Sequence, residues 1–261
     1  MDISLKGKWA VICGSSQGIG LATARELAVN GANCILLARN AEALKGVVGQ
    51  LTKQDGQQHL WVAADFSDTA QVGDSIKGII SERRVEILIN NTGGPKAGPI
   101  LEAAPEAFEL AFKQHLVNNQ ILARSVVPGM REAGYGRIIN IISTSVKTPL
   151  QGLGVSNTIR LSVAAWAKTL ANELGQYNIT INNILPGLTR TVRLNDLMIH
   201  TAKVAGRDQS VVESQMKESI PMKRFGTPEE IANMIAFLAS PAASYVNGAN
   251  IAVDGGRTPA L

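Results

Sequence analysis

The strongest constraint on how this chain folds is a group of glycines that directly follows an apolar segment near its start. Residues 11–13 are Val-Ile-Cys, and Gly14, Gly18 and Gly20 come next, followed at once by an amphipathic stretch over 21–29. This order predicts a strand, a tight turn and a helix whose first amides face the turn. Such amides and the positive end of a helix dipole attract a phosphate, and glycines let it approach closely. We therefore predict a nucleotide-binding βαβ unit, with an ordinary strand-to-helix connection as the alternative.

Strand-like and helix-like segments alternate along the rest of the chain with short turns between them. The predicted strands lie over 9–13, 34–38, 60–63, 86–90, 137–142, 179–185 and 249–253. The predicted helices lie over 18–30, 41–53, 69–83, 105–132, 154–174 and 228–239. This alternation is typical of an α/β fold in which helices cover both faces of a doubly wound, mainly parallel sheet. We find no linker or repeat, so we predict a single three-layer α/β/α domain over 1–261.

Composition narrows the class of protein further. With 45% hydrophobic residues, the chain is not disordered and can bury a substantial core. No apolar run approaches the ~20 residues of a membrane helix. The first strand begins too close to the N-terminus to leave room for a signal peptide. The 25 basic and 21 acidic residues are scattered, and no basic stripe with aromatic residues indicates nucleic-acid binding. We expect a cytoplasmic protein that binds neither nucleic acid nor membrane.

Two cysteines, Cys13 and Cys34, both fall within predicted strands. This placement predicts buried thiols rather than a disulfide or a metal site. We expect no metal cofactor.

Several motifs lie at the expected strand ends, and together they are far more specific than any one alone. They are Gly14-Ser15-Ser16-Gln17-Gly18-Ile19-Gly20, Asp65, Asn90-Asn91-Thr92-Gly93, Gly136-Arg137-Ile138-Ile139-Asn140-Ile141, Pro186-Gly187 and Val253-Asp254-Gly255-Gly256. Through them the chain resembles the short-chain dehydrogenase/reductases over nearly its whole length, and most of all the β-ketoacyl-carrier-protein-reductase-like branch. The resemblance implies a seven-stranded Rossmann sheet, a nicotinamide dinucleotide, and a homotetramer or homodimer.

The resemblance also implies a set of cofactor-binding residues that follow successive strands. They are Gly14, Ser16, Gln17, Gly18, Ile19, Gly20, Arg39, Asp65, Phe66, Asn91, Gly93, Arg160, Pro186, Gly187 and Thr191. Cys13 departs from the family, which usually has threonine there. An acidic residue after the second strand would select a free ribose 2′-hydroxyl, but this chain has Ala38 and then Arg39. A guanidinium binds a 2′-phosphate bidentately, so Arg39 favours NADP(H), with NAD(H) as the alternative.

The family transfers hydride with Asn, Ser, Tyr and Lys, and this chain keeps only one of these four residues. Alignment on Asn140 places the serine at Ser143. The tyrosine position, thirteen residues later, is Ser156, and the lysine position is Arg160. The asparagine of the preceding long helix falls on His115. No tyrosine occurs in the run 153–160 at any register.

These substitutions change what the site can do with a proton. A serine hydroxyl is a far weaker acid than a phenol, so Ser156 does not replace the tyrosine alone. Arg160 can orient ribose hydroxyls and stabilise an oxyanion, but it does not exchange protons at ordinary pH. His115 can relay a proton, and the plainer alternative is a structural helix histidine. Lys147 is a further candidate or an ordinary surface lysine.

We predict an NADP(H)-dependent oxidoreductase that interconverts a carbonyl and an alcohol through Ser143, Ser156, Arg160 and His115. The proton would come from His115, from Ser156 through water, or from the substrate. One alternative is a catalytically silent dinucleotide-binding protein. Another is a non-redox lyase like the halohydrin dehalogenases, which carry arginine at the lysine position. The segment 188–225 is polar and irregular, with some helical character. It is where this fold usually builds its substrate lid, and its arginines suit either an anionic substrate or a solvated loop.

Overall fold

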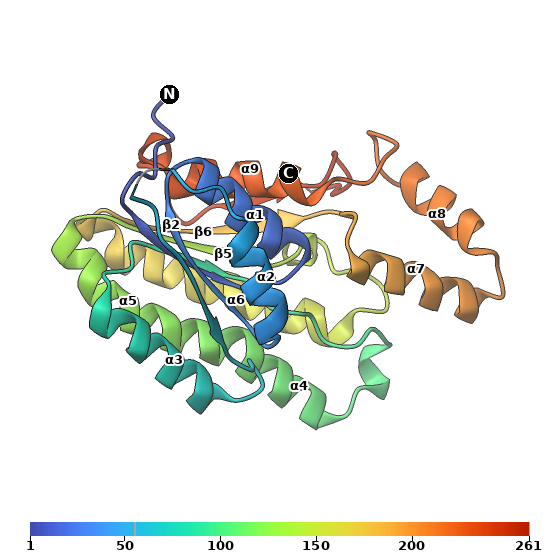
Figure 1. Cartoon of the computed structure of the whole chain (residues 1–261). Helices are drawn as coiled ribbons and strands as arrows, with labels where there is room; N and C mark the ends of the chain where they lie inside the picture. The colour runs from blue at the N-terminus through green and yellow to red at the C-terminus, as the bar shows by residue number, and fades with distance from the viewer. Residues whose placement is uncertain (55, 261) are drawn as a thin grey trace.

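The computed structural model describes residues 1–54 and 56–260, and these form a single domain built on one parallel sheet (Figure 1). The strands are β1 (Trp9–Cys13), β2 (Asn33–Ala38), β3 (His59–Ala63), β4 (Ile87–Asn90), β5 (Gly136–Ile141), β6 (Ile179–Pro186) and β7 (Asn250–Val253). Their order is β3-β2-β1-β4-β5-β6-β7, and every neighbouring pair is parallel. The predicted seven-stranded doubly wound sheet is confirmed. Residue 261, the end of the predicted domain, lies outside the described residues.

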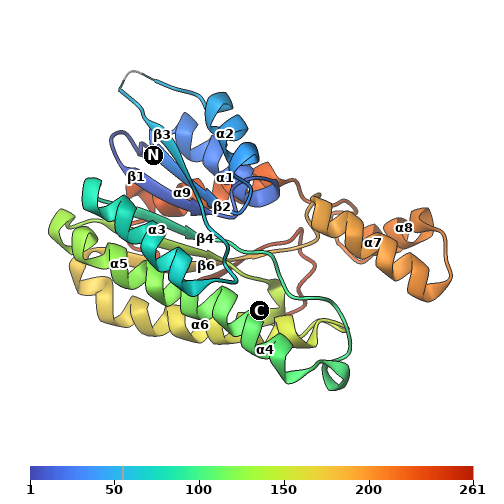
Figure 2. The same ribbon diagram turned by 60° about the horizontal axis from the view of Figure 1, so that its bottom comes forward.

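Helices cover both faces of the sheet, as Figures 1 and 2 show from two directions. One layer holds α1 (Gly18–Val29), α2 (Ala41–Gln50) and α9 (Pro228–Ala239), and the other holds α3 (Thr69–Glu82), α5 (Asn118–Ala133) and α6 (Gly154–Leu174). Successive residues of a strand point to opposite faces, so Ile12 packs in the first layer's core and Val11 in the second's. Because both faces are buried, the inner strands are apolar almost throughout.

The long helix predicted over 105–132 is interrupted. It consists of α4 (Pro105–Phe112), a five-residue π-helical turn over Lys113–Val117, and α5. A π turn carries an extra residue, which shifts the side chains around it relative to a regular helix. Here the turn contains His115, whose side chain is buried. This local widening has no signature in the spacing of apolar residues, so the prediction missed it.

The segment predicted as largely irregular contains two helices, α7 (Val192–Ala205) and α8 (Gln209–Glu218). Figure 2 shows both helices projecting from the body of the domain beyond α9 and α6. The side chains of Thr191 and Asp208 cap their first turns by accepting backbone N–H bonds. Only Val212 of α8 is buried. This helix therefore lacks the broad apolar face by which a helix is recognised in a sequence.

A ladder of asparagine side chains crosses the sheet from β4 to β7. Each side-chain nitrogen donates to the next asparagine's oxygen at 2.8 Å, along the series Asn90, Asn140, Asn183 and Asn250. These residues stand directly opposite one another in the strand register. The ladder therefore satisfies buried polar groups and ties four strands to one register.

Both cysteines are free and buried, as predicted. Burial raises the pKa of the Cys13 thiol to about 12, so this residue stays protonated at neutral pH. No helix in residues 1–54 and 56–260 is long and apolar enough to cross a membrane.

Candidate active site

The turn between β1 and α1 requires its glycines for two different reasons. Gly14 and Gly18 have φ angles of +60° and +57°, which side chains rarely adopt. At Gly20 a Cβ atom would lie 2.2 Å from the Gly14 carbonyl oxygen, so helix and turn could not pack as they do. The helix begins after Gln17, whose side chain makes no capping bond, and its first turn holds no acidic residue. The first amides of α1 are thus free to bind an anion.

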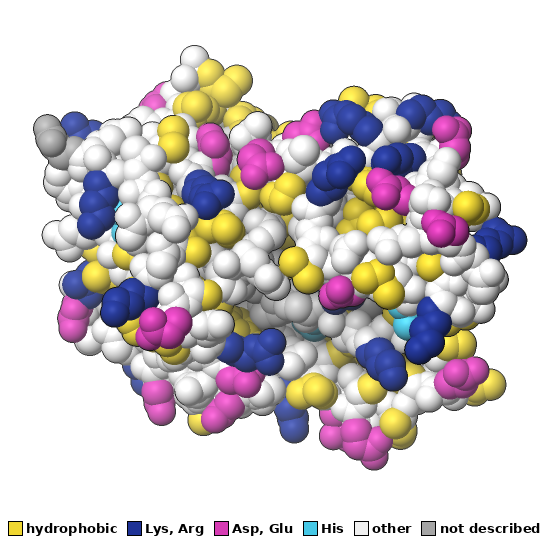
Figure 3. All heavy atoms as spheres, turned by 45° about the vertical axis from the view of Figure 1, so that its right-hand side comes forward, with side chains coloured by type: hydrophobic (Ala, Val, Ile, Leu, Met, Phe, Trp, Pro, Cys, Tyr) yellow, Lys and Arg dark blue, Asp and Glu magenta, His cyan; other side chains and the backbone are white. Residues whose placement is uncertain are grey.

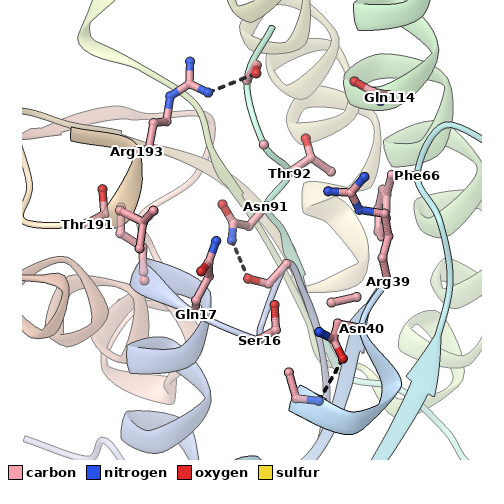
Figure 4. A pocket seen from close by; sticks show the side chains of 18 of the residues that line it. Ser16, Gln17, Arg39, Asn40, Phe66, Asn91, Thr92, Gln114, Thr191 and Arg193 are labelled. Atoms are coloured by element: carbon pink, nitrogen blue, oxygen red, sulfur yellow. Dashed lines mark hydrogen bonds between the residues drawn. The ribbon is translucent and has the colours of Figure 1, made fainter. Parts of the chain in front are cut away.

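Asn91 holds this turn from the neighbouring strand. Its side-chain nitrogen donates to the carbonyl oxygens of Cys13 and Gly14, at 3.3 Å each. Figure 4 shows Asn91 reaching the turn from above Ser16. Asn91 therefore both lines the site and fixes the loop that forms it.

A cavity of about 620 Å³ runs from this turn across the ends of β1, β2 and β4 (Figure 4). Most of the predicted cofactor-binding residues line it: Gly14, Ser16, Gln17, Gly18, Ile19, Arg39, Asp65, Phe66, Asn91, Gly93 and Thr191. Gly20 does not line it and acts through packing alone. Thr92, Gly94, Gln114 and Arg193 also line it and were not predicted as cofactor contacts.

Arg39 and Phe66 lie at the far end of this cavity from Thr191 (Figure 4). In the described part of the chain, no carboxylate forms an ion pair with Arg39. Asp65 accepts a hydrogen bond from the Ser67 amide at 2.9 Å, which is the main reason that its pKa is lowered. The helix N-cap is Asp68, so Asp65 is free of that role. This end presents an exposed, unpaired guanidinium suited to a phosphate.

A second, smaller cavity of about 210 Å³ adjoins the first. The two cavities share six lining residues: Ile19, Asn91, Thr92, Gly94, Thr191 and Arg193. Figure 3 shows a hollow in the surface on the side of the molecule that carries α7 and α8. The predicted site residues Ser143, Ser156, Arg160, Pro186 and Gly187 line the smaller cavity. The geometry thus joins a long groove to a compact chamber.

The two serines enter the chamber from different elements. Ser143 follows β5, and its hydroxyl oxygen accepts a hydrogen bond from the Ser145 amide at 3.1 Å. This bond leaves the Ser143 hydroxyl hydrogen available to a substrate oxygen. Ser156 lies in the first turn of α6 and is buried. Lys147 is exposed and lines neither cavity, so the structure does not bring it to the site.

Arg160 lies one turn after Ser156 on α6 and is only 8% exposed. Its Nη1 donates to the Ile141 carbonyl oxygen at 2.7 Å, while its Nε has no hydrogen-bond partner. Burial, with a smaller contribution from nearby Arg193, lowers the pKa of Arg160 to about 10. The guanidinium therefore stays charged at neutral pH, in a place where a cation is poorly solvated.

His115 lies behind the wall of the site rather than in it. Its Nδ1 is 2.5 Å from the Thr92 hydroxyl oxygen, and its Nε2 is buried without a partner. Neither cavity is lined by His115, although Thr92 lines both. Burial, then the charges of Arg160 and Arg193, lower the pKa of His115 to about 2, so the ring is neutral. Proton transfer by His115 stays a prediction, and Thr92, which contacts Nδ1 and lines both cavities, would link the ring to the site.

Comparison with known proteins decides the family. A family model described as enoyl-(acyl-carrier-protein) reductase matches residues 14–258. A protein named short chain dehydrogenase/reductase astE, from Aspergillus oryzae, is 32% identical over 97% of this chain and 95% of its own. The chain belongs to the short-chain dehydrogenase/reductase family. The predicted family is confirmed.

Two further similarities concern reductases. A 3-oxoacyl-(acyl-carrier-protein) reductase of Aquifex aeolicus is 30% identical over 98% of this chain and 99% of its own, which agrees with the predicted branch. The solved structure of L-sorbose reductase from Gluconobacter frateurii, complexed with NADPH and L-sorbose, is 36% identical. It covers all of both chains with a TM-score of 0.93. The fold of this short-chain dehydrogenase/reductase is therefore that of a known oxidoreductase along its whole length.

Proposed function

We propose that this protein is an NADP(H)-dependent oxidoreductase that interconverts a carbonyl and an alcohol with an altered catalytic site. One observation carries the proposal. A groove with a glycine turn at its middle and Arg39 at its end opens into a chamber that contains Ser143 and Arg160. A dinucleotide along the groove would bring its reactive end to the chamber, where a small substrate would meet it.

The residues of the groove fit NADP(H). The amides that open α1, together with Gly14 and Gly18, would hold the pyrophosphate, and Arg39 would hold the 2′-phosphate. Ala38 places no carboxylate where a free 2′-hydroxyl would need one. The relative from Gluconobacter frateurii binds NADPH, which supports this choice over NAD(H). When bound, the nicotinamide supplies or accepts the hydride.

The chain's own residues act on the substrate oxygen. The Ser143 hydroxyl donates a hydrogen bond to the carbonyl oxygen and polarises it. The Arg160 guanidinium, which is buried, stabilises the negative charge that develops there. Residue 156 is a serine and not a tyrosine. The proton therefore reaches the substrate oxygen from a water in contact with the Ser156 hydroxyl, or from the substrate itself.

The segment 188–225 is proposed as the substrate lid. Leu188, Thr189, Leu194 and Leu197 from this segment line the chamber, so its position controls access. A homotetramer or homodimer, and a cytoplasmic location, stay predictions.

A catalytically silent dinucleotide-binding protein is the second candidate, and one observation favours it. The described lining of the chamber holds no tyrosine, lysine or histidine, and therefore no ordinary proton donor near neutral pH. A halohydrin-dehalogenase-like protein would need only a halide site at this place, so the wide groove with its glycine turn disfavours that alternative.

NADPH consumption distinguishes these candidates. We expect purified protein to oxidise NADPH with at least one member of a panel of ketones, aldehydes and quinones. Replacing Ser143 with Ala removes the donor to the substrate oxygen, so kcat should fall about a hundredfold. Lys147→Ala is the matched control and should keep the wild-type rate. Tight NADPH binding without turnover of any panel member would establish the silent protein instead, and halide release from a halohydrin would establish the dehalogenase.

A further inference from the structure

The chamber carries an excess of positive charge. Its lining includes Arg160, Arg193 and Arg257 but no aspartate or glutamate. Within residues 1–54 and 56–260, none of these arginines forms an ion pair with a carboxylate. Arg257 donates from Nε to the Ser219 hydroxyl, which is neutral. A chamber of about 210 Å³ is thus lined by three arginines that form no ion pair among the described residues.

Arg160 is the member of this group that most needs a partner. It is 8% exposed, its Nη1 donates to the Ile141 carbonyl oxygen, and its Nε is buried without an acceptor among the described residues. Removing a cation from water without a paired anion is costly. A structure that maintains this arrangement gains most from a ligand that brings a negative charge into the chamber.

Arg193 also lines the chamber, and hydrogen bonds to residues far away in the sequence hold its side chain in place. Its Nη1 donates to the Gly94 carbonyl oxygen at 3.0 Å, and its Nη2 lies 3.5 Å from the Pro95 oxygen. Figure 4 shows this guanidinium extending from the lid side to the loop after β4. A Cβ atom at residue 94 would lie 2.5 Å from Nη2, so Gly94 leaves room for the arginine. Arg193 and Arg160 line the same chamber, and after burial the charge of Arg193 is the next cause that lowers the pKa of Arg160.

In the proposed binding mode the cofactor brings no negative charge into the chamber itself, although Arg193 lines the groove as well. In the proposed binding mode the phosphates of NADP(H) lie at the glycine turn and at Arg39, whereas the nicotinamide riboside reaches the chamber. That part of the molecule is neutral when reduced and positive when oxidised. A negative charge on the second ligand, the substrate, would therefore balance the charge of the chamber.

We propose that the substrate is a small oxo acid or hydroxy acid whose carboxylate binds between Arg160 and Arg193. The proposal rests on the proposed function and specifies its substrate class. Guanidinium groups bind carboxylates bidentately, which would orient the neighbouring carbonyl toward Ser143. The chamber is smaller than the ~300–1,000 Å³ pockets that take larger ligands, so the acid has few carbon atoms.

Matched substrate pairs test this class. 2-Oxobutanoate, acetoacetate and levulinate are each compared with their methyl esters in NADPH oxidation by the full chain. The carboxylate form should have a kcat/KM at least tenfold higher than its ester, and added salt should reduce this preference. Equal or better turnover of the uncharged esters would overturn the proposal.

Two arginines of the lid segment provide the matched variants. Arg193→Gln removes a charge from the chamber and should lower the preference for the acid about tenfold. Arg190→Gln removes a charge three residues away that lines neither cavity and packs over the Phe225 ring at 5.9 Å. It should leave the preference unchanged. An equal effect of both variants, or no effect of Arg193→Gln, would overturn the assignment.

A binding experiment without turnover distinguishes the failure of this inference from the failure of the proposed function. NADPH is titrated first, and malonate or malonamide is then titrated into the NADPH complex while its fluorescence is followed. Malonate should bind and malonamide should not. If NADPH binds but the two probes behave alike, the substrate class is wrong and the oxidoreductase stands. If Arg193→Gln weakens only NADPH, Arg193 contacts the cofactor and the substrate class is wrong. If NADPH does not bind at all, the proposed function itself fails.

Discussion

Arg39 is the residue on which the choice between the two pyridine dinucleotides depends. It lies exposed at the end of the large cavity, and Ala38 before it carries no charge. Replacing Arg39 with Asp should weaken NADPH about ten- to a hundredfold and tighten NADH, because a carboxylate repels the 2′-phosphate and accepts a bond from the 2′-hydroxyl. Fluorescence titration with both cofactors measures the change. Arg25→Asp, the same charge reversal outside both cavities, should leave the ranking intact. An unchanged ranking in Arg39→Asp would remove Arg39 from cofactor selection.

His115 predicts a measurable acid sensitivity. Its pKa is about 2 in the folded protein and near ~6.5 when unfolded, so only the unfolded chain takes up the proton as pH falls below 6.5. The neutral ring therefore contributes stability above pH 6.5 that is lost toward lower pH. Between pH 6.5 and 4.5, wild type should lose about 2 kcal/mol more than His115→Gln. Urea unfolding of both proteins across this range checks the difference, and parallel curves would contradict the buried neutral ring.

At the residue scale, the sequence predicted most of the side chains that line the groove and several that line the chamber, with His115 as the exception among the predicted catalytic residues. Motif spacing predicted Gly14, Gly18 and Asn91 as cofactor contacts, and all three line the groove because their places follow from strand ends. The π turn that contains the buried His115 was not predictable, although a structural helix histidine was one of the two alternatives for this residue. Arg193 was recognised only as part of a mixed segment. Its contact with Gly94 joins residues 99 positions apart, and no local pattern encodes that distance.

At the scale of elements, the asparagine ladder predicts a different loss of stability for each position at which it is interrupted. Asn183→Ala interrupts the ladder, leaving the Asn140 side-chain nitrogen and the Asn250 oxygen without their partners. It should cost about 2–4 kcal/mol of unfolding free energy, because buried polar groups lose their bonds. Asn250→Ala removes only the exposed end of the ladder and should cost about 1 kcal/mol. Urea unfolding compares them, and equal losses would show that the ladder does not act as a connected unit.

Elements with strong apolar periodicity were predicted well, and the others were not. The strands of the sheet and α6 lie within one or two residues of the expected bounds. The predicted helix over 41–53 instead ends at Gln50, where Leu51 adopts an extended conformation. The segment 188–225 gave only a weak helical signal, because α7 buries three residues and α8 buries one. Lids need mobility more than packing, and low burial is the physical reason that sequence patterns describe them poorly.

At the scale of the whole molecule, the position of the site follows from the sheet. The strand order reverses between β1 and β4, so their loops part and open a crevice at the carboxyl ends. The groove lies across those ends, and the chamber lies beside it beneath the lid segment. This placement was predictable from the alternation of strands and helices alone. The charge balance of the chamber was not, because it depends on arginines that three distant parts of the chain contribute.

The most direct test of dinucleotide binding is a fluorescence titration of the wild-type protein with NADPH and NADH side by side. It examines the glycine turn and Arg39 together and requires no knowledge of the substrate. We expect saturable binding of both, with NADPH at least about tenfold tighter, because only NADPH offers Arg39 a phosphate. Absence of affinity for either nucleotide would contradict the assignment of the groove, and with it the oxidoreductase.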